Sequence, residues 1–114
     1  MKHVNYYYNG FTISACNYNA NLTTDNSHYY IATTETYNDG AWHLFVGIYD
    51  GTLLSIYVDG VLKVSNGAKY TIENDIDIRI GADSHLSFFT GKIDDVRIWK
   101  RALSENEIIF LYNE

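Results

Sequence analysis

The residues best suited to bond-breaking chemistry are acidic, and they stand in one short run. Glu73, Asp75 and Asp77 alternate along the chain, so on a strand their carboxylates share one face at a spacing of about 6.6 Å. Retaining glycosidases hold two carboxylates about 5 Å apart around the scissile bond. The solvated face of a strand whose opposite face carries Ile76 and Ile78 explains the run better. The run therefore does not identify a hydrolase.

Nucleophilic and metal chemistry have no better support in the sequence. Cys16 is the single cysteine, which excludes a disulfide within the chain and a cysteine-based zinc site. The four histidines show no metal-ligand spacing, and no Ser, His and Asp follow the pattern of a glycine-flanked nucleophile elbow. The sequence predicts a protein that is not an enzyme, with no catalytic residues.

Recognition of a polar, ring-shaped ligand suits the composition, which includes 11 tyrosines. Sugar rings stack on aromatic side chains while amide and carboxylate groups bind their hydroxyls. One expected aromatic face carries Phe45, Tyr49 and Tyr57, and the polar loops form a second expected site. An AT-rich genome also explains many Tyr and Asn residues, and the aromatic face equally suits a packing layer or a subunit interface. The candidate ligand-binding residues are Tyr18, Asn19, Asn38, Asp39, Asp83, His85, Tyr49 and Tyr57.

Length and charge exclude several classes of protein. The 114 residues suffice for one domain. The net charge of −6 argues against nucleic acid as a partner and against docking to an anionic membrane. No run of 18 apolar residues predicts a membrane span, and residues 1–8 lack the apolar stretch of a signal peptide.

The middle of the chain alternates in the way that strands do. Residues 43–49, 53–58 and 61–65 are separated by Asp50-Gly51 and Asp59-Gly60, dipeptides typical of tight hairpin turns. This pattern predicts a three-stranded antiparallel meander. Its expected core face carries Leu44, Val46, Ile48, Leu54, Ile56 and Val58.

The flanking segments are predicted from the same patterns. Ser104 and Glu107 form a capping box, which predicts a helix of about two turns at the C-terminus. Polar residues 17–27 are expected to be a loop. Further strands are predicted over 11–16, 29–34, 75–80 and 92–99. We also expect Trp42, Ile78, Ile80, Val96, Ile98 and Trp99 in the core or at its margin.

An ordered set of short motifs gives the chain a family resemblance. Trp42-His43, Asp50-Gly51, Tyr57-Val58-Asp59-Gly60, Ile80-Gly81, Gly91-Lys92-Ile93-Asp94-Asp95-Val96-Arg97-Ile98 and Ala102-Leu103-Ser104 occur in this order. The set resembles the laminin-G-like group of the concanavalin A-like lectin/glucanase superfamily, most strongly over 39–112. The resemblance implies an all-β, two-sheet antiparallel jelly-roll sandwich with a short C-terminal helix. Residues 1–114 would form a single such domain.

The resemblance also implies a site and a partner. Members often bind one structural calcium through an aspartate of the last strand, and the matching residues here are Asp94 and Asp95. Alternatively, Asp94 caps a turn or pairs with Lys92 or Arg97. Members also carry a first strand that this chain lacks, which would leave an open sheet edge and favour a homo-oligomer or another assembly partner. The alternative is that residues 1–8 fill the edge.

Together these features predict a non-catalytic binding module that recognises carbohydrate or a protein surface. Its expected location is extracellular or on a virion surface, although no signal peptide is found on this chain. The alternative function is structural: a virion decoration, fibre or filament subunit completed by strand exchange with its neighbours.

Overall fold

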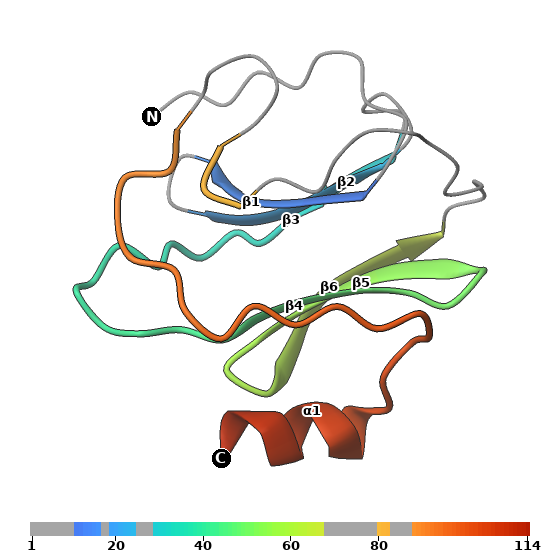
Figure 1. The fold of residues 1–114 in the computed structure, drawn as a ribbon. Helices are drawn as coiled ribbons and strands as arrows, with labels where there is room; N and C mark the ends of the chain where they lie inside the picture. Colours follow the sequence, from blue (N-terminus) through green and yellow to red (C-terminus); the bar gives the residue numbers. More distant parts are fainter. Residues whose placement is uncertain (1–10, 17–18, 25–28, 68–79, 83–87) are drawn as a thin grey trace.

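The computed structural model describes residues 11–16, 19–24, 29–67, 80–82 and 88–114. These residues form two antiparallel sheets of three strands each and one helix. The first sheet contains β1 (Phe11–Cys16), β2 (Asn19–Thr24) and β3 (Tyr29–Ala32), and the second contains β4 (Phe45–Tyr49), β5 (Leu53–Val58) and β6 (Val61–Gly67). The helix α1 spans Glu105–Tyr112. The two sheets face each other, and α1 lies on the far side of the second sheet (Figure 1). The predicted all-β sandwich with a short C-terminal helix is confirmed.

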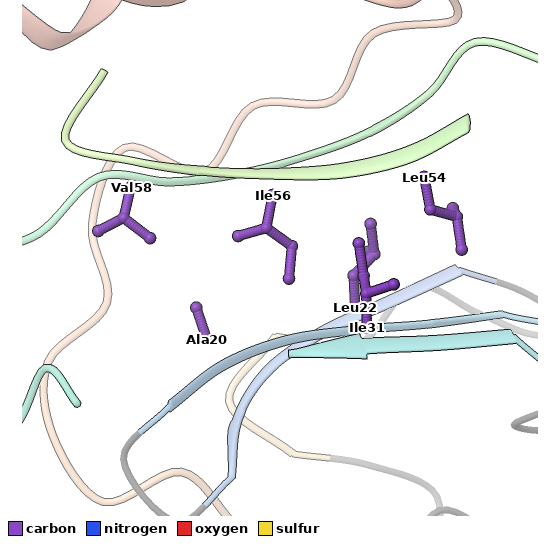
Figure 2. Close-up of a cluster of buried hydrophobic side chains, with 6 residues drawn as sticks. All are labelled: Ala20, Leu22, Ile31, Leu54, Ile56 and Val58. Atoms are coloured by element: carbon purple, nitrogen blue, oxygen red, sulfur yellow. The ribbon is translucent and has the colours of Figure 1, made fainter. Parts of the chain in front are cut away.

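The core lies between the two sheets (Figure 2). Ala20, Leu22 and Ile31 project from the first sheet toward three aliphatic side chains of β5, and none of the six is more than 5% exposed. Complete burial of one large aliphatic side chain contributes about 1.5–3 kcal/mol. This cluster therefore dominates the stability of the described fold. The β5 side chains are Leu54, Ile56 and Val58.

The loop predicted over 17–27 is wrong, because β2 runs through it. Ala20 pairs with Ala15 and Leu22 pairs with Ile13 in the register of β1 and β2. Ala20 and Leu22 alternate with asparagines and are both fully buried. The polar residues between them hid this short alternation in the sequence.

The predicted meander is confirmed, and its second turn is of a well-defined type. Asp59 and Gly60 both have positive φ, 54° and 81°, as a type I′ hairpin turn requires. A bulge in β6 follows, because Ile56 pairs with Val64 whereas Tyr57 pairs with Leu62. The extra residue is Lys63, whose Nζ lies 2.9 Å from a carboxylate oxygen of Glu35.

The face assigned to β4 was wrong. Antiparallel pairing joins Phe45 to Val58 and Tyr49 to Leu54, and residues directly opposite one another share a face. Phe45 and Tyr49 therefore pack against the core cluster, whereas Val46 lies on the other face with its partner Tyr57. Apolar residues occupy both faces of β4, so alternation alone could not distinguish them.

The predicted strand over 92–99 does not form. Asp95 has a φ of 52°, a left-handed conformation that interrupts extended backbone. Every residue from 92 to 99 is exposed. The expected core positions Trp42, Ile80, Val96, Ile98 and Trp99 are likewise wrong, because these side chains are 40–68% exposed. Ile78 and most of the predicted strand 75–80 lie outside the described residues.

The capping box at the start of α1 is confirmed. The Glu107 backbone N–H donates to Ser104 Oγ at 3.2 Å, and the Ser104 N–H donates to Glu107 Oε1 at 3.0 Å. Ile108 is fully buried. At the other end of the helix, the Tyr112 ring lies 3.4 Å from the position that a Cβ at Gly60 would occupy. The helix therefore packs against the turn between β5 and β6.

Candidate binding surface

The residues predicted to bind a ligand do not gather into one site among the described residues. Tyr18, Asp83 and His85 lie outside the described residues. Asn19 begins β2, and its side-chain amide donates to the carbonyl oxygens of Thr33 at 2.7 Å and Glu35 at 3.0 Å. These two bonds use both amide hydrogens of Asn19, so the side chain ties β2 to the segment after β3.

The aromatic face predicted from Phe45, Tyr49 and Tyr57 is also divided. Tyr49 packs against the core between the sheets, whereas Tyr57 lies on the opposite face of the second sheet as the partner of Val46. Partial burial raises the pKa of the Tyr57 hydroxyl, and the nearby Glu105 carboxylate raises it further. Two rings on opposite faces of a sheet cannot form one stacking platform for a sugar.

The predicted residues Asn38 and Asp39 are both exposed. Asp39 belongs to a hydrogen-bonded group with His43 and Asp59, which we call the carboxylate clasp. His43 Nε2 lies 2.8 Å from Asp39 Oδ1, and His43 Nδ1 lies 2.7 Å from Asp59 Oδ2. Asp59 Oδ1 also accepts the backbone N–H of Leu44 at 2.9 Å. The clasp therefore joins the loop before β4 to the turn between β5 and β6.

The protonation of the clasp follows from its geometry. The hydrogen bonds that His43 donates to the Asp59 and Asp39 carboxylates raise the pKa of the imidazole, and the bond that Asp39 accepts lowers the pKa of its carboxyl. Both ring nitrogens must carry a proton to donate to the two carboxylates at once. His43 thus has no nitrogen left for proton transfer to a substrate or for a metal.

The predicted calcium ligands do not form a site by themselves. Asp94 Oδ1 accepts the backbone N–H of the next residue, Asp95, at 2.8 Å. Calcium requires six to eight oxygen ligands, and the described part of the chain holds no group of three or more His, Cys, Asp or Glu side chains suited to a metal. Further ligands would have to come from other segments, so calcium stays a prediction.

Several exposed apolar side chains lie within residues 80–82 and 88–101, which we call the late segment. We call Ile80, Phe88, Ile93, Val96 and Ile98 the late-segment surface; their exposed fractions run from 44% to 68%. Phe88 and Ala82 form an isolated bridge, and the Phe89 N–H donates to the Gly81 carbonyl at 2.8 Å, so 80–82 and 88–89 lie side by side. Contiguous apolar exposure marks interaction sites, and these five side chains are candidates for such a surface within the described part of the chain.

One sequence signal could have distinguished this segment from a core strand. Lys92, Arg97, Lys100 and Arg101 are four of the eight basic residues of the chain, and they fall within ten positions. Lys and Arg are almost never fully buried unless they are paired. Such a charge density favours an exposed segment whatever the alternation of its apolar residues.

In the described part of the chain, the structure contains no helix with the length and apolar character that a membrane crossing requires.

The sheets, their register and the C-terminal helix define a concanavalin A-like sandwich. A family model described as the concanavalin A-like lectin/glucanases superfamily, of the laminin G type, matches residues 3–109. The chain belongs to this family. The matched range reaches closer to the N-terminus than the resemblance over 39–112 predicted.

Two individual proteins are similar to this chain. Adhesion G-protein coupled receptor V1 of Danio rerio is 32% identical over 100 residues, which cover 82% of this chain and 2% of the receptor. The chain thus spans a small fraction of the length of this curated relative. The crystal structure of an S-layer domain-containing protein (residues 221–444) from Clostridium thermocellum ATCC 27405 superposes with a TM-score of 0.61 at 20% identity. That match covers 98% of this chain and 67% of the other, and it supports the fold alone.

Proposed function

We propose that this chain is a non-catalytic binding module whose ligand is a protein surface. The observation that carries the proposal is the late-segment surface, where aliphatic side chains such as Val96 and Ile98 are 50% and 68% exposed. Burial of such side chains against a partner contributes about 25 cal/mol for each Å² removed from water. An aliphatic patch of this kind suits the apolar centre of a protein interface.

A protein ligand fits the described residues better than a glycan does. Glycan recognition needs rings and free polar groups that converge on one place. Here Tyr49 packs in the core and the Asn19 amide is bound to backbone carbonyls. The late segment exposes aliphatic side chains such as Ile93 and Ile98 together with six charged side chains within residues 92–101, and an apolar centre with a polar rim is typical of protein interfaces.

Two further observations support this proposal. The described histidine, His43, has carboxylates on both ring nitrogens, which is a structural arrangement rather than that of a general base. A relative of this chain is named as an adhesion receptor. We accordingly propose an extracellular location, with the module acting in adhesion.

The test compares three forms of the immobilised chain: wild type, Val96→Asp with Ile98→Asp, and Val61→Asp. Val61 is 54% exposed on β6, outside the late segment, and serves as the matched control. We expect wild type and the control to retain the same cell-surface proteins and the double variant to lose them. A glycan array that gives strong signals, unchanged in the double variant, would contradict the proposal.

A second candidate function is an assembly subunit joined through a sheet edge. β1 is the outermost strand of the first sheet as described. Ile13 pairs with the fully buried Leu22, which in turn pairs with Ile31, yet Ile13 is 42% exposed. An added strand from a neighbour would cover this row and satisfy the edge. Light scattering of wild type and Ile13→Asp tests it: the candidate predicts a multimer that the substitution dissociates, and a wild-type monomer excludes it.

A further inference from the structure

A hollow of about 290 Å³ opens between the end of the late segment and α1. Phe110 stands beside it with 70% of its surface exposed, and Trp99 on the other wall is 40% exposed. A volume near 300 Å³ lies at the lower end of the range for small-ligand pockets. The hollow is lined by Trp99, Leu103, Asn106, Glu107, Phe110 and Leu111.

The acidic group in this lining is already engaged. The Arg101 guanidinium donates to both oxygens of Glu107, at 2.8 and 2.6 Å, and the Ser104 N–H donates to one of them. These bonds lower the pKa of Glu107 to about 2. A carboxylate whose oxygens already accept these bonds has little left to offer a sugar hydroxyl.

We infer that a second copy of this chain docks here about a two-fold axis, with Phe110 of each copy in the hollow of the other. A two-fold interface requires one surface that complements itself. This surface meets that requirement, because an exposed aromatic ring stands next to a hollow lined by Trp99, Leu103 and Leu111.

The charges around the hollow are self-complementary as well. Residues 92–101 hold four basic and two acidic residues, whereas 102–114 hold three acidic residues and no basic one. Arg97 pairs with Glu114 at 3.0 Å and Arg101 pairs with Glu107 within one copy. Lys100 and Glu105 are exposed and form no ion pair within the described part of the chain. Lys100 and Glu105 each adjoin a residue that lines the hollow, Trp99 and Asn106, so we expect the two-fold arrangement to bring Lys100 of one copy toward Glu105 of the other.

This dimer goes beyond the proposed function and uses different residues. The late-segment surface remains open in each copy, so a dimer presents two binding surfaces at once. Two linked sites can bind far more tightly than one, which suits a module with a single modest apolar patch.

Sedimentation over a range of concentrations tests the inference, with Trp42→Phe as the background because it leaves Trp99 as the sole tryptophan. We expect a dimer, accompanied by a blue shift of Trp99 emission as the ring leaves water. Phe110→Asp should raise the dissociation constant at least tenfold, as at interface hot spots. Val61→Asp should leave it unchanged, because Val61 is 54% exposed and pairs with the core residue Val58, on the face of β6 opposite to α1. A monomer at all concentrations, or a dimer that Phe110→Asp does not weaken, would overturn the inference.

A charge exchange tests the predicted orientation. Lys100→Glu and Glu105→Lys should each weaken the dimer several-fold by bringing like charges together, and mixing the two variants should restore dimers of wild-type affinity. Mixed samples no tighter than either variant alone would overturn the two-fold arrangement. The tests of the dimer and of the proposed function are independent. The variant with Val96→Asp and Ile98→Asp should still dimerise, and the Phe110→Asp variant should still capture partner proteins.

Discussion

The inter-sheet core and the late segment carry the same kind of apolar alternation but end in opposite environments. Leu54, Ile56 and Val58 alternate along β5 and are no more than 1% exposed. Val96 and Ile98 alternate in the same way and are half exposed or more. The difference lies in what faces them, because β2 and β3 cover β5 (Figure 2), whereas the late segment has solvent over its side chains. Alternation thus indicates which side chains share a face, and the neighbouring layer decides whether that face is buried.

The largest expected effect tests this contrast with one substitution in each region. Ile56→Ala should lower the free energy of unfolding by about 3–4 kcal/mol, because it removes buried methyl groups and leaves a cavity. Ile98→Ala should change it by no more than about 0.5 kcal/mol, because the side chain is already in water. Urea denaturation of both variants measures the difference, and equal losses would contradict it.

A second pair of substitutions compares two aspartates with left-handed backbone, Asp59 and Asp95. Asp59→Ala should lower the free energy of unfolding by about 2 kcal/mol. The substitution places an alanine in left-handed backbone and also removes the hydrogen bonds to the Leu44 N–H and to His43. Asp95→Ala should cost about 1 kcal/mol, because only the strain applies. If urea denaturation shows that Asp95→Ala loses more free energy of unfolding than Asp59→Ala, the turn between β5 and β6 does not hold the start of β4 in place.

The helix end gives a smaller effect. Ser104→Ala removes one half of the capping box and should lower the free energy of unfolding by about 1 kcal/mol. Ser65→Ala is a suitable control, because Ser65 is exposed on β6 and its hydroxyl bonds only to that of Ser55 among the described residues. A loss at Ser65 as large as that at Ser104 would contradict a specific role for the cap.

The carboxylate clasp should make the stability depend on pH, and this is the smallest of the expected effects. The pKa of His43 is raised in the folded chain, so the folded state binds the proton more tightly than the unfolded state does. The stabilisation is complete below the ordinary histidine pKa and is lost as the pH rises through the folded value. His43→Gln should remove this decline in the free energy of unfolding above the ordinary histidine pKa. An identical pH profile in wild type and the variant would exclude the clasp as its cause.

Much of the fold follows from local signals in the sequence. Asp59-Gly60 specifies a type I′ turn by its backbone requirements, and Ser104 with Glu107 specifies the helix start by hydrogen bonds within four residues. The face of β4 could have been derived by pairing residues across the Asp50-Gly51 hairpin, which joins odd positions to even ones. The apolar alternation within β4 by itself indicates the wrong face, because both faces carry apolar residues.

The candidate site depends on contacts that no local pattern contains. Tyr49 and Tyr57 share a residue type, yet one packs in the core and the other lies on the opposite face of its sheet. Val96 and Ile98 are exposed because none of the described residues forms a layer over them, and the left-handed backbone at Asp95 interrupts the strand that would have carried them. Both features arise from tertiary arrangement, so the sequence placed these residues in the core.

Thiol labelling of single cysteines tests the contrast between the two regions most directly. Ile56→Cys and Ile98→Cys would be introduced separately into a Cys16→Ser background, and the rate of reaction with a small disulfide reagent would be measured under native conditions. We expect the cysteine at position 98 to react as fast as a free thiol, whereas the cysteine at position 56 should react only through global unfolding. Protection of position 98 to the same degree as position 56 would contradict it.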